Sequence, residues 1–455
     1  MARFFYNLAL LLLLPYVGLH LLLRGRRQPE YLRHLGERFG RYPTPQPSPR
    51  RGEGAGLPSP ADGRGAGGEG VIWLHAVSVG ETRAAVPLVA ALKERYPGHR
   101  ILLTHMTPTG RRTSEELLGD GVLRAYLPYD YPLAVRRFLR HFRPAVGVIM
   151  ETELWPNLVA ACKTQGVPLL LANARLSEKS ARRYARFPNL TRGALQGLAA
   201  IAAQTGQDAD RLRALGAPQV EVLGNVKFDT LPPPEQLALG EALRRKIGPR
   251  PVLLAASTRE GEEALLFAAR AQHPPGETLL VVVPRHPQRF EEVAALAGRA
   301  GFTVIRRSEI AVGAGLPAIP GAEIAGKPAP AEILLGDSMG EMFAYYAACD
   351  VAFIGGSLLD YGSQNLIEAC AAGKPVLIGR STYNFSHAAE QALECGAARQ
   401  IGSAEELLEV ADALLRDEAA LRRMGEAGRE FAARHRGATA RTLEMIERYL
   451  SPLSG

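Results

Sequence analysis

Short, continuous apolar runs alternate along the chain with longer stretches of helical periodicity, beginning at Val71. The runs read VIWLHA, ILLTHM, VGVIME, PLLLAN, AAIAAQ and VEVLG in the first half, and VLLAAS, TLLVVVP, TVIRR, EILLG, VAFIGG and PVLIG in the second. Continuous apolar strands are typical of parallel sheets that helices cover on both faces. The intervening stretches, such as residues 82–95 and 154–165, are long enough for crossover helices. The pattern predicts an α/β protein with two doubly wound sheets in succession.

A Pro-rich stretch separates the two series of strands. The first series ends near Gly224, and residues 231–234, followed by a charged helix to Lys246, lead into the second. We therefore expect residues 71–230 to form one Rossmann-like domain, and residues 231–455 to form another with additional helices at its C-terminal end. The two sheets are expected to face each other across a cleft, because open α/β sheets bind ligands at the carboxyl ends of their strands.

Residues 4–23 form an apolar run without a formally charged side chain, about as long as a bilayer-spanning helix. Six Arg and two Glu follow in residues 24–41, a net charge of +4 that places the rest of the chain in the cytoplasm. The basic residues come after the apolar run, which argues against a cleaved signal peptide. An alternative is a helix that lies in the membrane interface or packs on the globular body, because Asn7, Pro15 and His20 interrupt the run.

Residues 1–41 are thus predicted to be a membrane anchor with a basic juxtamembrane segment. Residues 42–70 contain eight Gly and six Pro and almost no apolar side chains. Such a composition cannot bury enough surface to order itself, so we expect a disordered insertion with no part in the chemistry.

Composition narrows the classes of protein further. Of 455 residues, 47% are apolar and 22% charged, which excludes wholesale disorder and coiled-coil architectures. The four cysteines lie far apart without a C-x-x-C pair, so neither a disulfide framework nor a cysteine zinc site is indicated, and a reducing compartment is expected. The net charge of +8 favours anionic partners.

The first predicted strand leads into a turn with candidate chemistry. The turn reads Ser78-Val79-Gly80-Glu81-Thr82, without the G-x-G-x-x-G of dinucleotide sites, and no G-x-x-x-x-G-K-[ST] occurs in the chain. A carboxylate at the amide-rich start of a helix stays ionised and therefore basic. Glu81 is our candidate general base, and the alternative is an ordinary helix-start carboxylate.

Two further turns of the first half carry charge. The strand VIM ends in Glu151 and Glu153, and we expect helix capping to explain one of them and a ligand or the domain contact to explain the other. After the next strand, residues 175–187 have a net charge of +4. This segment is either a solvated helix face or a surface that meets the phosphates of a lipid or its membrane. Its charged residues are Arg175, Glu178, Lys179, Arg182, Arg183 and Arg186.

In the second half, three strand-to-helix turns contain anion-binding residue types. Arg285, His286 and Arg289 follow one strand and suit a phosphate or carboxylate, unless they pair with helix acids. In the other two turns, helix amides are available to an anion, although capping is an equally simple role. These turns contain Ser257, Thr258 and Arg259, and Asp337, Ser338, Met339 and Gly340.

The segment FIGGSLLDYGSQNLIEACAAGKPVLIG, residues 353–379, is the most informative. Gly355 and Gly356 allow the backbone to approach a ligand closely. We expect a helix that opens at residues 364–365 and carries Glu368 one turn in, so that its amides face a phosphate. The order of Gly-Gly-Ser, polar helix start, Glu and A-x-G-x-P-V resembles the sugar-nucleotide-binding domains of two-domain glycosyltransferases.

Seven motifs in order resemble those of 3-deoxy-D-manno-octulosonic acid (Kdo) transferases. The resemblance covers residues 71 to about 430, and the insertion at 42–70 and the turn RSTYNF at 380–385 depart from the family pattern. The motifs are HAVSVGE (75–81), ETELWPN (151–157), NARLS (173–177), GNVKFD (224–229), PRHP (284–287), GDSMGEM (336–342) and GGS with the following Asn and Glu (355–368).

The resemblance implies a GT-B fold, CMP-Kdo as donor, a lipid A precursor (lipid IVA) as acceptor, and an anchor on the cytoplasmic face of the bacterial inner membrane. It also implies that Glu81 is the catalytic base, that residues 71–230 are the acceptor side and that residues 231–455 bind the CMP-sugar. The predicted donor site is Ser257, Thr258, Arg259, Arg285, His286, Asp337, Ser338, Met339, Gly340, Glu341, Met342, Gly356, Ser357, Asn365 and Glu368. Ser78, Gly80, Glu151, Glu153 and Arg175 are assigned to the acceptor or the domain cleft.

The predicted reaction is a single inverting displacement, without a metal, a cofactor or a nucleic-acid partner. Arg175 and Arg259 are both candidates to face the Kdo carboxylate. The alternatives are another membrane-associated sugar-nucleotide transferase or epimerase of the same fold, because one fold hosts several activities, and a non-catalytic lipid-binding relative.

Overall fold

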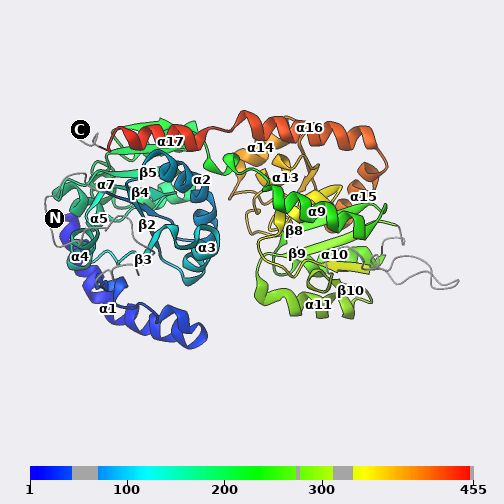
Figure 1. Cartoon of the computed structure of the whole chain (residues 1–455), viewed down its shortest axis with the longest axis horizontal. Coiled ribbons are helices and arrows are strands. Elements are labelled where there is room, and N and C mark those ends of the chain that lie inside the picture. The colour runs from blue at the N-terminus through cyan, green and yellow to red at the C-terminus, as the bar shows by residue number, and fades with distance from the viewer. Residues whose placement is uncertain (44–69, 273–276, 311–331, 451–455) are drawn as a thin grey trace, which may run out of the picture. The chain divides into compact units, whose positions relative to one another are not determined.

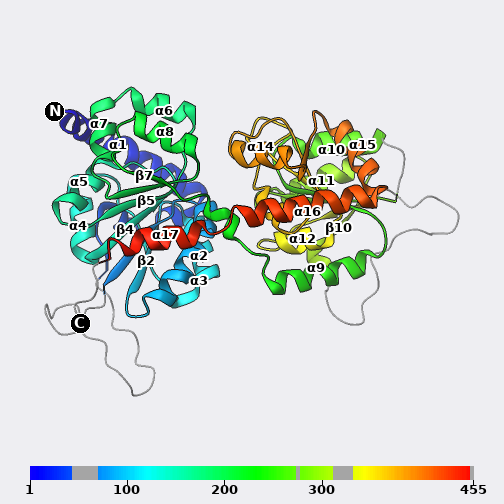
Figure 2. The same ribbon diagram turned by 90° about the horizontal axis from the view of Figure 1, so that it is seen from above.

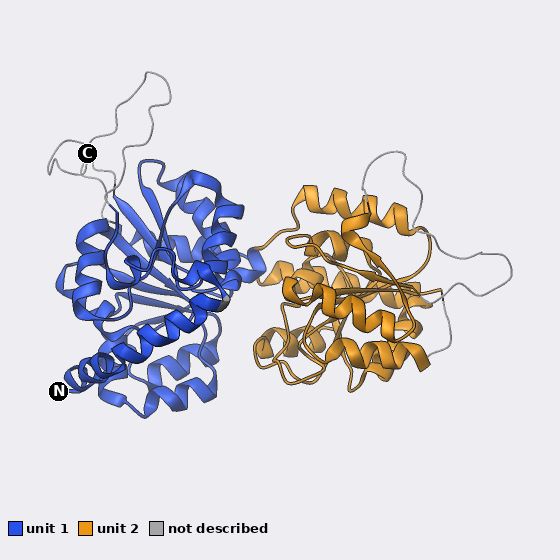
Figure 3. Cartoon of the chain, turned by 90° about the horizontal axis from the view of Figure 1, so that it is seen from below, with its two compact units in different colours: residues 1–229, 436–455 blue, residues 230–435 orange. Residues whose placement is uncertain are grey.

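The computed structural model describes residues 1–43, 70–272, 277–310 and 332–450. The chain forms two compact units (Figure 3): unit 1 comprises residues 1–229 and 436–455, and unit 2 comprises residues 230–435. The predicted insertion at 42–70 lies almost entirely outside the described residues.

Unit 1 is built on a seven-stranded parallel sheet of order β3-β2-β1-β4-β5-β6-β7 (Figure 1). Its strands are β1 Val71–His75, β2 Arg100–His105, β3 Leu123–Tyr126, β4 Pro144–Met150, β5 Leu169–Ala174, β6 Ala200–Ala203 and β7 Val220–Val222. Its helices are α1 Ala2–Arg27, α2 Val79–Arg95, α3 Pro108–Leu118, α4 Pro132–Phe142, α5 Pro156–Thr164, α6 Glu178–Ala185, α7 Pro188–Leu195, α8 Gly206–Ala214 and α17 Ala438–Glu447, with short 3₁₀ turns at Pro29–Tyr31, Glu37–Phe39, Gly119–Gly121 and Val226–Asp229.

Unit 2 repeats this architecture with a sheet of order β10-β11-β9-β8-β12-β13-β14, also parallel. Its strands are β8 Val252–Thr258, β9 Leu279–Pro284, β10 Thr303–Arg306, β11 Glu332–Leu335, β12 Val351–Ile354, β13 Val376–Ile378 and β14 Ala398–Gln400. Its helices are α9 Pro234–Ile247, α10 Glu262–Gln272, α11 Phe290–Arg299, α12 Met342–Ala348, α13 Ile367–Ala371, α14 Ser386–Glu394, α15 Ala404–Leu415 and α16 Glu418–Arg434, with 3₁₀ turns at Pro287–Arg289 and Arg307–Glu309.

Each sheet is buried on both faces, as its continuous apolar runs predict. In unit 1, Ile72 and Leu74 pack toward the layer of α2 on one face, whereas Trp73 packs on the other face against Phe138 of α4. Alternate residues of one strand therefore enter different cores. The predicted α/β architecture of two Rossmann-like domains is confirmed, and each of the twelve apolar runs forms a strand.

The C-terminal helix α17 belongs to unit 1, although the order of elements in the sequence predicts that it joins the second domain. The chain leaves unit 2 after α16 and α17 lies against α2 (Figures 1 and 2). Met445 and Ile446 are fully buried in the unit 1 core, and Asp229 accepts hydrogen bonds from the amides of Gly437 (2.6 Å) and Thr439. The amphipathic pattern of α17 did not reveal which sheet its apolar side covers.

Helix α1 is long and apolar enough to cross a membrane, and 6% of its most apolar window is buried. It is therefore compatible with the predicted membrane anchor. The Leu and Phe side chains on this helix are largely exposed. Soluble proteins seldom expose a contiguous apolar surface of this kind.

Candidate active site

Glu81 lies at the amino end of α2 and is tied into the turn that follows β1. The Val77 amide donates to Glu81 Oε2 (2.8 Å), and the Ser78 hydroxyl donates to Oε1 (2.9 Å). The Glu81 amide donates in turn to Ser78 Oγ (3.4 Å), so Ser78 caps the start of α2. The prediction that Glu81 is a carboxylate at the start of a helix is thus confirmed. The first turn of α2 is open beside Gly80, because a Cβ added there would meet only Ser78 Oγ, at 3.9 Å.

The electrostatics of Glu81 also suit a general base. Burial raises the pKa of Glu81 to about 7, and the negative charge of Glu151 adds to this rise. A base whose pKa lies near the working pH combines a deprotonated form with strong proton affinity. Capping and base chemistry are therefore compatible roles of one side chain.

The two carboxylates after β4 belong to the same neighbourhood, because β4 pairs with β1. Glu151 adopts a left-handed backbone (φ 58°), and its Oε1 accepts from Lys227 Nζ at 2.9 Å. Burial, together with the Glu151 charge, raises the pKa of Glu153. Sequence reasoning missed Lys227 as a partner of this group, although the residue lies within the GNVKFD motif.

The expectation that capping explains one of these carboxylates is wrong. Helix α5 begins after Trp155 without a side-chain cap from the preceding acids. Asp130 takes that role instead, since its carboxylate accepts from the amides of Asn157 (2.9 Å) and Leu158 (2.8 Å). Neither Glu151, which pairs with Lys227, nor Glu153 caps α5, and their assignment to the acceptor or the domain cleft stays a prediction.

Arg175 follows β5, the strand next to β4. Its amide donates to Thr152 Oγ1 (3.1 Å), and the Thr152 hydroxyl donates to its carbonyl, so the ends of β4 and β5 are joined. His75, on β1, is fully buried and bonds Thr104 through Nδ1. Burial lowers the pKa of His75 to about 3, so this histidine is a neutral core residue.

In unit 2, the predicted donor residues gather at the carboxyl ends of β11, β9, β8 and β12, four adjacent strands. The Arg285 amide donates to the Thr258 carbonyl (3.0 Å), which ties the ends of β9 and β8 together. Burial lowers the pKa of His286, and the nearby charges of Arg259, Arg285 and Arg289 lower it further. The structure thus brings together His286 and a group of arginines that disfavour its protonated form.

Two buried glutamates at the start of α10 support these turns, and sequence reasoning missed both. Glu262 accepts from the amides of Arg259 (2.8 Å), Gly356 (2.6 Å) and Leu358 (3.0 Å). Glu263 accepts from the Thr258 hydroxyl (2.7 Å) and pairs with Arg289 (2.7 Å). Arg289 also pairs with Glu292, so the anticipated ion-pair role holds for Arg289.

Contacts with Arg307 and Ser308, together with one internal hydrogen bond, hold the turn at 337–342. Asp337 accepts from the Ser308 amide (2.8 Å) and hydroxyl (2.6 Å), whereas Glu341 pairs with Arg307 (3.1 Å) and accepts from Ser338 (2.7 Å). Met339 is exposed, and Gly340 has a positive φ of 83° with open space around it. Met339 and Gly340 are therefore the solvent-accessible residues of this turn. Met342 is the first residue of α12.

Glycine is required in the turn after β12. A Cβ on Gly355 would lie 2.7 Å from the Thr258 amide, and Gly356 has a positive φ of 72°. Ser357 is fully buried, with its hydroxyl donating to the Ile354 carbonyl and accepting from the Gly379 amide (2.8 Å). Ser357 thus positions the turn, and its contact with a donor stays a prediction.

The following helix starts later than predicted. Helix α13 begins at Ile367, which places Glu368 in its first turn, because Asn365 Oδ1 accepts from the Ile367 amide (3.1 Å) and holds the residues before it in a turn. Asn365 also donates to Glu368 (3.0 Å). Helices α12 and α13 are short, with seven and five residues.

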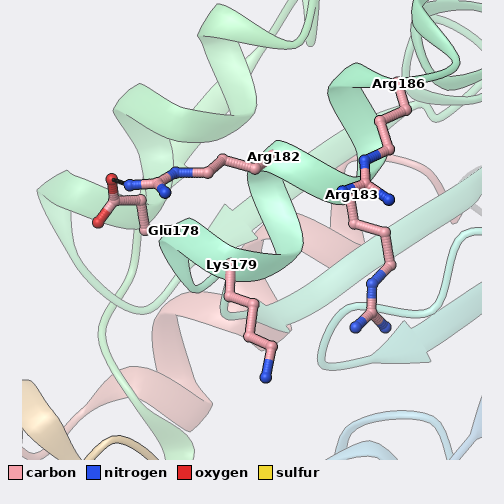
Figure 4. Close-up of a pocket in the computed structure, with 5 residues that line it drawn as sticks. All are labelled: Glu178, Lys179, Arg182, Arg183 and Arg186. Carbon is pink, nitrogen blue, oxygen red and sulfur yellow. Dashed lines mark hydrogen bonds and ion pairs between the residues drawn. The ribbon is translucent and has the colours of Figure 1, made fainter.

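A basic pocket lies on α6 and its C-terminal end (Figure 4). Its volume is about 470 Å³, and Arg182 pairs with Glu178, the one acid in its lining. The predicted basic segment is thereby confirmed as a surface feature of unit 1. The lining residues are Glu178, Lys179, Arg182, Arg183 and Arg186.

Comparison with known proteins identifies both halves of the chain. Residues 33–230 match the family described as 3-deoxy-D-manno-octulosonic-acid transferase, and residues 322–431 match glycosyl transferases group 1. The chain is 44% identical to a 3-deoxy-D-manno-octulosonic acid transferase of Bordetella pertussis, over 99% of this chain and 100% of the relative. Identity to the enzyme of the same name from Haemophilus influenzae is 35%, over 99% of both chains.

Solved structures of the same architecture include a glycosyltransferase from Rickettsia africae, with a TM-score of 0.55 and 15% identity over 84% of this chain and 99% of that one. At this identity the likeness shows the fold alone. The match is nevertheless consistent with two Rossmann-like domains of GT-B type, as the sequence predicts. The near-complete alignments at 44% and 35% identity show that the chain belongs to the 3-deoxy-D-manno-octulosonic acid transferase family of GT-B glycosyltransferases.

Proposed function

We propose that this protein transfers Kdo from CMP-Kdo to a lipid A precursor, with lipid IVA as the acceptor, in lipopolysaccharide biosynthesis. The names of the full-length relatives support Kdo as the transferred sugar. The observation that carries the catalytic part is Glu81, a buried carboxylate at the carboxyl end of β1 whose pKa is raised to about 7.

Unit 2 supplies the donor site in this proposal. Arg259 and Arg285 lie at the ends of adjacent strands, and guanidinium groups match phosphate and carboxylate oxygens in pairs. The guanidinium of Arg259 lies 4.7 Å from the ring centroid of Tyr361, a contact that orients it. The donor residues predicted from sequence at the ends of β8, β9, β11 and β12 complete this site.

Glu81 acts on the acceptor. Its carboxylate accepts the proton of a lipid A sugar hydroxyl while the hydroxyl oxygen forms a bond to the anomeric carbon of Kdo. The bond from that carbon to the phosphate oxygen breaks, and its electron pair leaves with CMP. Because attack and departure occur on opposite faces, the configuration inverts. Arginines fixed beforehand stabilise the leaving phosphate without a metal ion.

We place the enzyme at the cytoplasmic face of the bacterial inner membrane. Helix α1 provides the apolar segment, and the arginines that follow it favour the cytoplasmic side. The substrates are then CMP-Kdo from the cytoplasm and an acceptor lipid from the same membrane.

A substitution of Glu81 tests the catalytic assignment. We expect Glu81→Gln to lower kcat by about 10²- to 10⁴-fold, the usual contribution of a general base, with CMP-Kdo binding unchanged. Glu94→Gln, on the exposed side of the same helix, is the matched control and keeps full activity. Undiminished turnover by Glu81→Gln would refute the base assignment.

A further inference from the structure

Arg38 is a buried cation in the segment that follows α1. The sequence places it among the six arginines of residues 24–41, and Arg33 of the same segment is exposed. Arg38 belongs to the 3₁₀ turn Glu37–Phe39 and is only 1% exposed. Among the described residues, its Nε and Nη2 atoms have no hydrogen-bond partner. Because burial of a guanidinium is costly unless its surroundings compensate the charge, specific contacts must hold Arg38 in this place.

Aromatic rings and one carbonyl group surround the Arg38 guanidinium. Its central carbon lies 4.2 Å from the ring centroid of Tyr126, and 5.8 and 6.0 Å from those of Tyr31 and Tyr129. The faces of aromatic rings attract a cation and so compensate part of its lost hydration. Arg38 Nη1 donates to the Met106 carbonyl (3.1 Å). This hydrogen bond reaches the residue that directly follows β2.

The neighbouring Glu37 fastens the same 3₁₀ turn to the body of unit 1. Glu37 is 5% exposed, and its Oε2 accepts from the Tyr126 amide (2.7 Å) and pairs with Arg111 Nη1 (3.1 Å). Tyr126 ends β3, and Arg111 lies near the start of α3. The Arg38 carbonyl accepts from the Tyr129 amide (2.9 Å). The turn is therefore bonded to the segments that follow β2 and β3 and to α3.

The turn between β2 and α3 in turn supports the turn that carries Glu81. The Thr107 hydroxyl donates to the Val77 carbonyl (3.1 Å), and the Val77 amide donates to Glu81 Oε2 (2.8 Å). A Cβ added to Gly110 would lie 3.2 Å from the Val77 carbonyl oxygen, so the start of α3 packs closely against the same turn. A series of contacts thus leads from Arg38 through the β2–α3 turn to the Glu81 carboxylate.

We propose that Arg38 is a positioning residue for the reaction, which fixes the turn after β2 and thereby the hydrogen bond from Val77 to Glu81. The proposal rests on the assignment of Glu81 as the base under the proposed function. The Val77 bond favours the ionised form of Glu81 and lowers its pKa, so loss of the Arg38 contacts is expected to raise that pKa. Glu151 and Glu153, the acids that face Glu81, stay in place in this experiment.

The pH dependence of the full-length enzyme in detergent tests this role. In Arg38→Gln, the pH below which kcat/KM falls is expected to rise by about one pH unit, because hydrogen bonds to a carboxylate favour its ionised form by about this much. At pH 6 the variant then loses a further factor of about ten in kcat/KM. Arg33→Gln removes the same charge from an exposed position of the same segment and keeps the wild-type pH profile. An unshifted profile in folded Arg38→Gln would overturn the proposal.

A second pair of variants interrupts the same series of contacts without touching the buried arginine. Thr107→Val removes the hydroxyl that donates to the Val77 carbonyl and keeps a side chain of similar shape. We expect the pH below which kcat/KM falls to shift upward, as in Arg38→Gln. Thr107→Ser retains the hydroxyl and is expected to retain the wild-type profile. The same profile for Thr107→Val and Thr107→Ser would contradict the proposed route, even if Arg38→Gln does not fold.

Hydrogen exchange separates this inference from the proposed reaction, because it requires no transfer activity. Amides of residues 77–81 and 106–110 are expected to exchange faster in Arg38→Gln than in the wild type, although both segments lie far from residue 38 in the sequence. Arg33→Gln is expected to exchange as the wild type does. Unchanged exchange in both segments of Arg38→Gln would overturn the proposal. Faster exchange in these segments, with a wild type that transfers no Kdo, would support the role of Arg38 in holding Glu81 and refute the proposed reaction.

Discussion

The chemistry of Glu81 depends on its surroundings more than on its own position. Two hydrogen bonds from Val77 and Ser78 favour its ionised form, but burial and the charge of Glu151 outweigh them, so the pKa rises to about 7. The sequence predicted the residue and its place at a helix start. It did not predict the raised pKa, because burial of Glu81 and the approach of Glu151, which lies far from it in the chain, both arise from tertiary packing.

This electrostatic arrangement predicts the pH dependence of the reaction. The base is active when it is ionised, so kcat/KM is expected to fall about tenfold per pH unit below about 7 and to level off above it. Glu151→Gln removes a negative neighbour and therefore lowers the pKa of Glu81. The pH at which kcat/KM begins to fall is then expected to shift to a lower value. Steady-state rates between pH 5 and 9 provide the measurement, with Glu94→Gln as control. If kcat/KM of Glu151→Gln falls at the same pH as in the wild type, Glu151 does not raise the pKa of the base.

At the scale of elements, the apolar runs predicted the strands well. The strands they missed are β3 and β14, with sequences LRAY and ARQ, which lie at the edges of their sheets. An edge strand is partly solvated and lacks the continuous apolar pattern of a central one. The role of Glu262 and Glu263 at the start of α10 was missed for a different reason, since both resemble solvent-exposed helix acids in sequence but are fully buried.

Glu262 is a positioning residue for the turn after β12. Glu262→Gln replaces one acceptor oxygen by a donor, and the buried amides that face it lose a partner. We expect the free energy of unfolding to fall by about 1–3 kcal/mol and CMP-Kdo to bind roughly tenfold more weakly.

Thermal unfolding and calorimetric titration of the donor measure these two effects. The exposed neighbour Glu260→Gln is the matched control and leaves both quantities unchanged. Wild-type donor affinity in Glu262→Gln would assign this carboxylate to stability alone.

At the scale of the whole molecule, the chain returns to unit 1 after it has formed unit 2. Helix α17 completes unit 1, and Met445 and Ile446 fill the core beneath it. The sequence indicated two successive domains correctly, but helical periodicity shows only that α17 has an apolar side. Long-range packing decides which sheet that side covers, and local pattern contains no information about it.

Truncation of the α17 core contact is therefore expected to destabilise unit 1, although residue 446 lies far from it in sequence. Ile446→Ala removes fully buried methyl groups, which costs about 2–5 kcal/mol in a well-packed core. Glu444→Ala, on the exposed side of the helix, serves as control. Hydrogen exchange resolved along the chain measures the effect, with faster exchange expected in β1 and α2. Loss of protection confined to unit 2 would contradict the assignment of α17.

The central claim is the transfer of Kdo to a lipid A precursor by a metal-independent base mechanism. Full-length protein in detergent is incubated with CMP-Kdo, the precursor and EDTA, and the mass of the lipid product is followed, with UDP-sugars as competing donors. We predict that the lipid gains one or more Kdo units and that UDP-sugars transfer nothing. A folded protein that leaves the lipid unchanged, or that uses only a UDP-sugar, would contradict the claim.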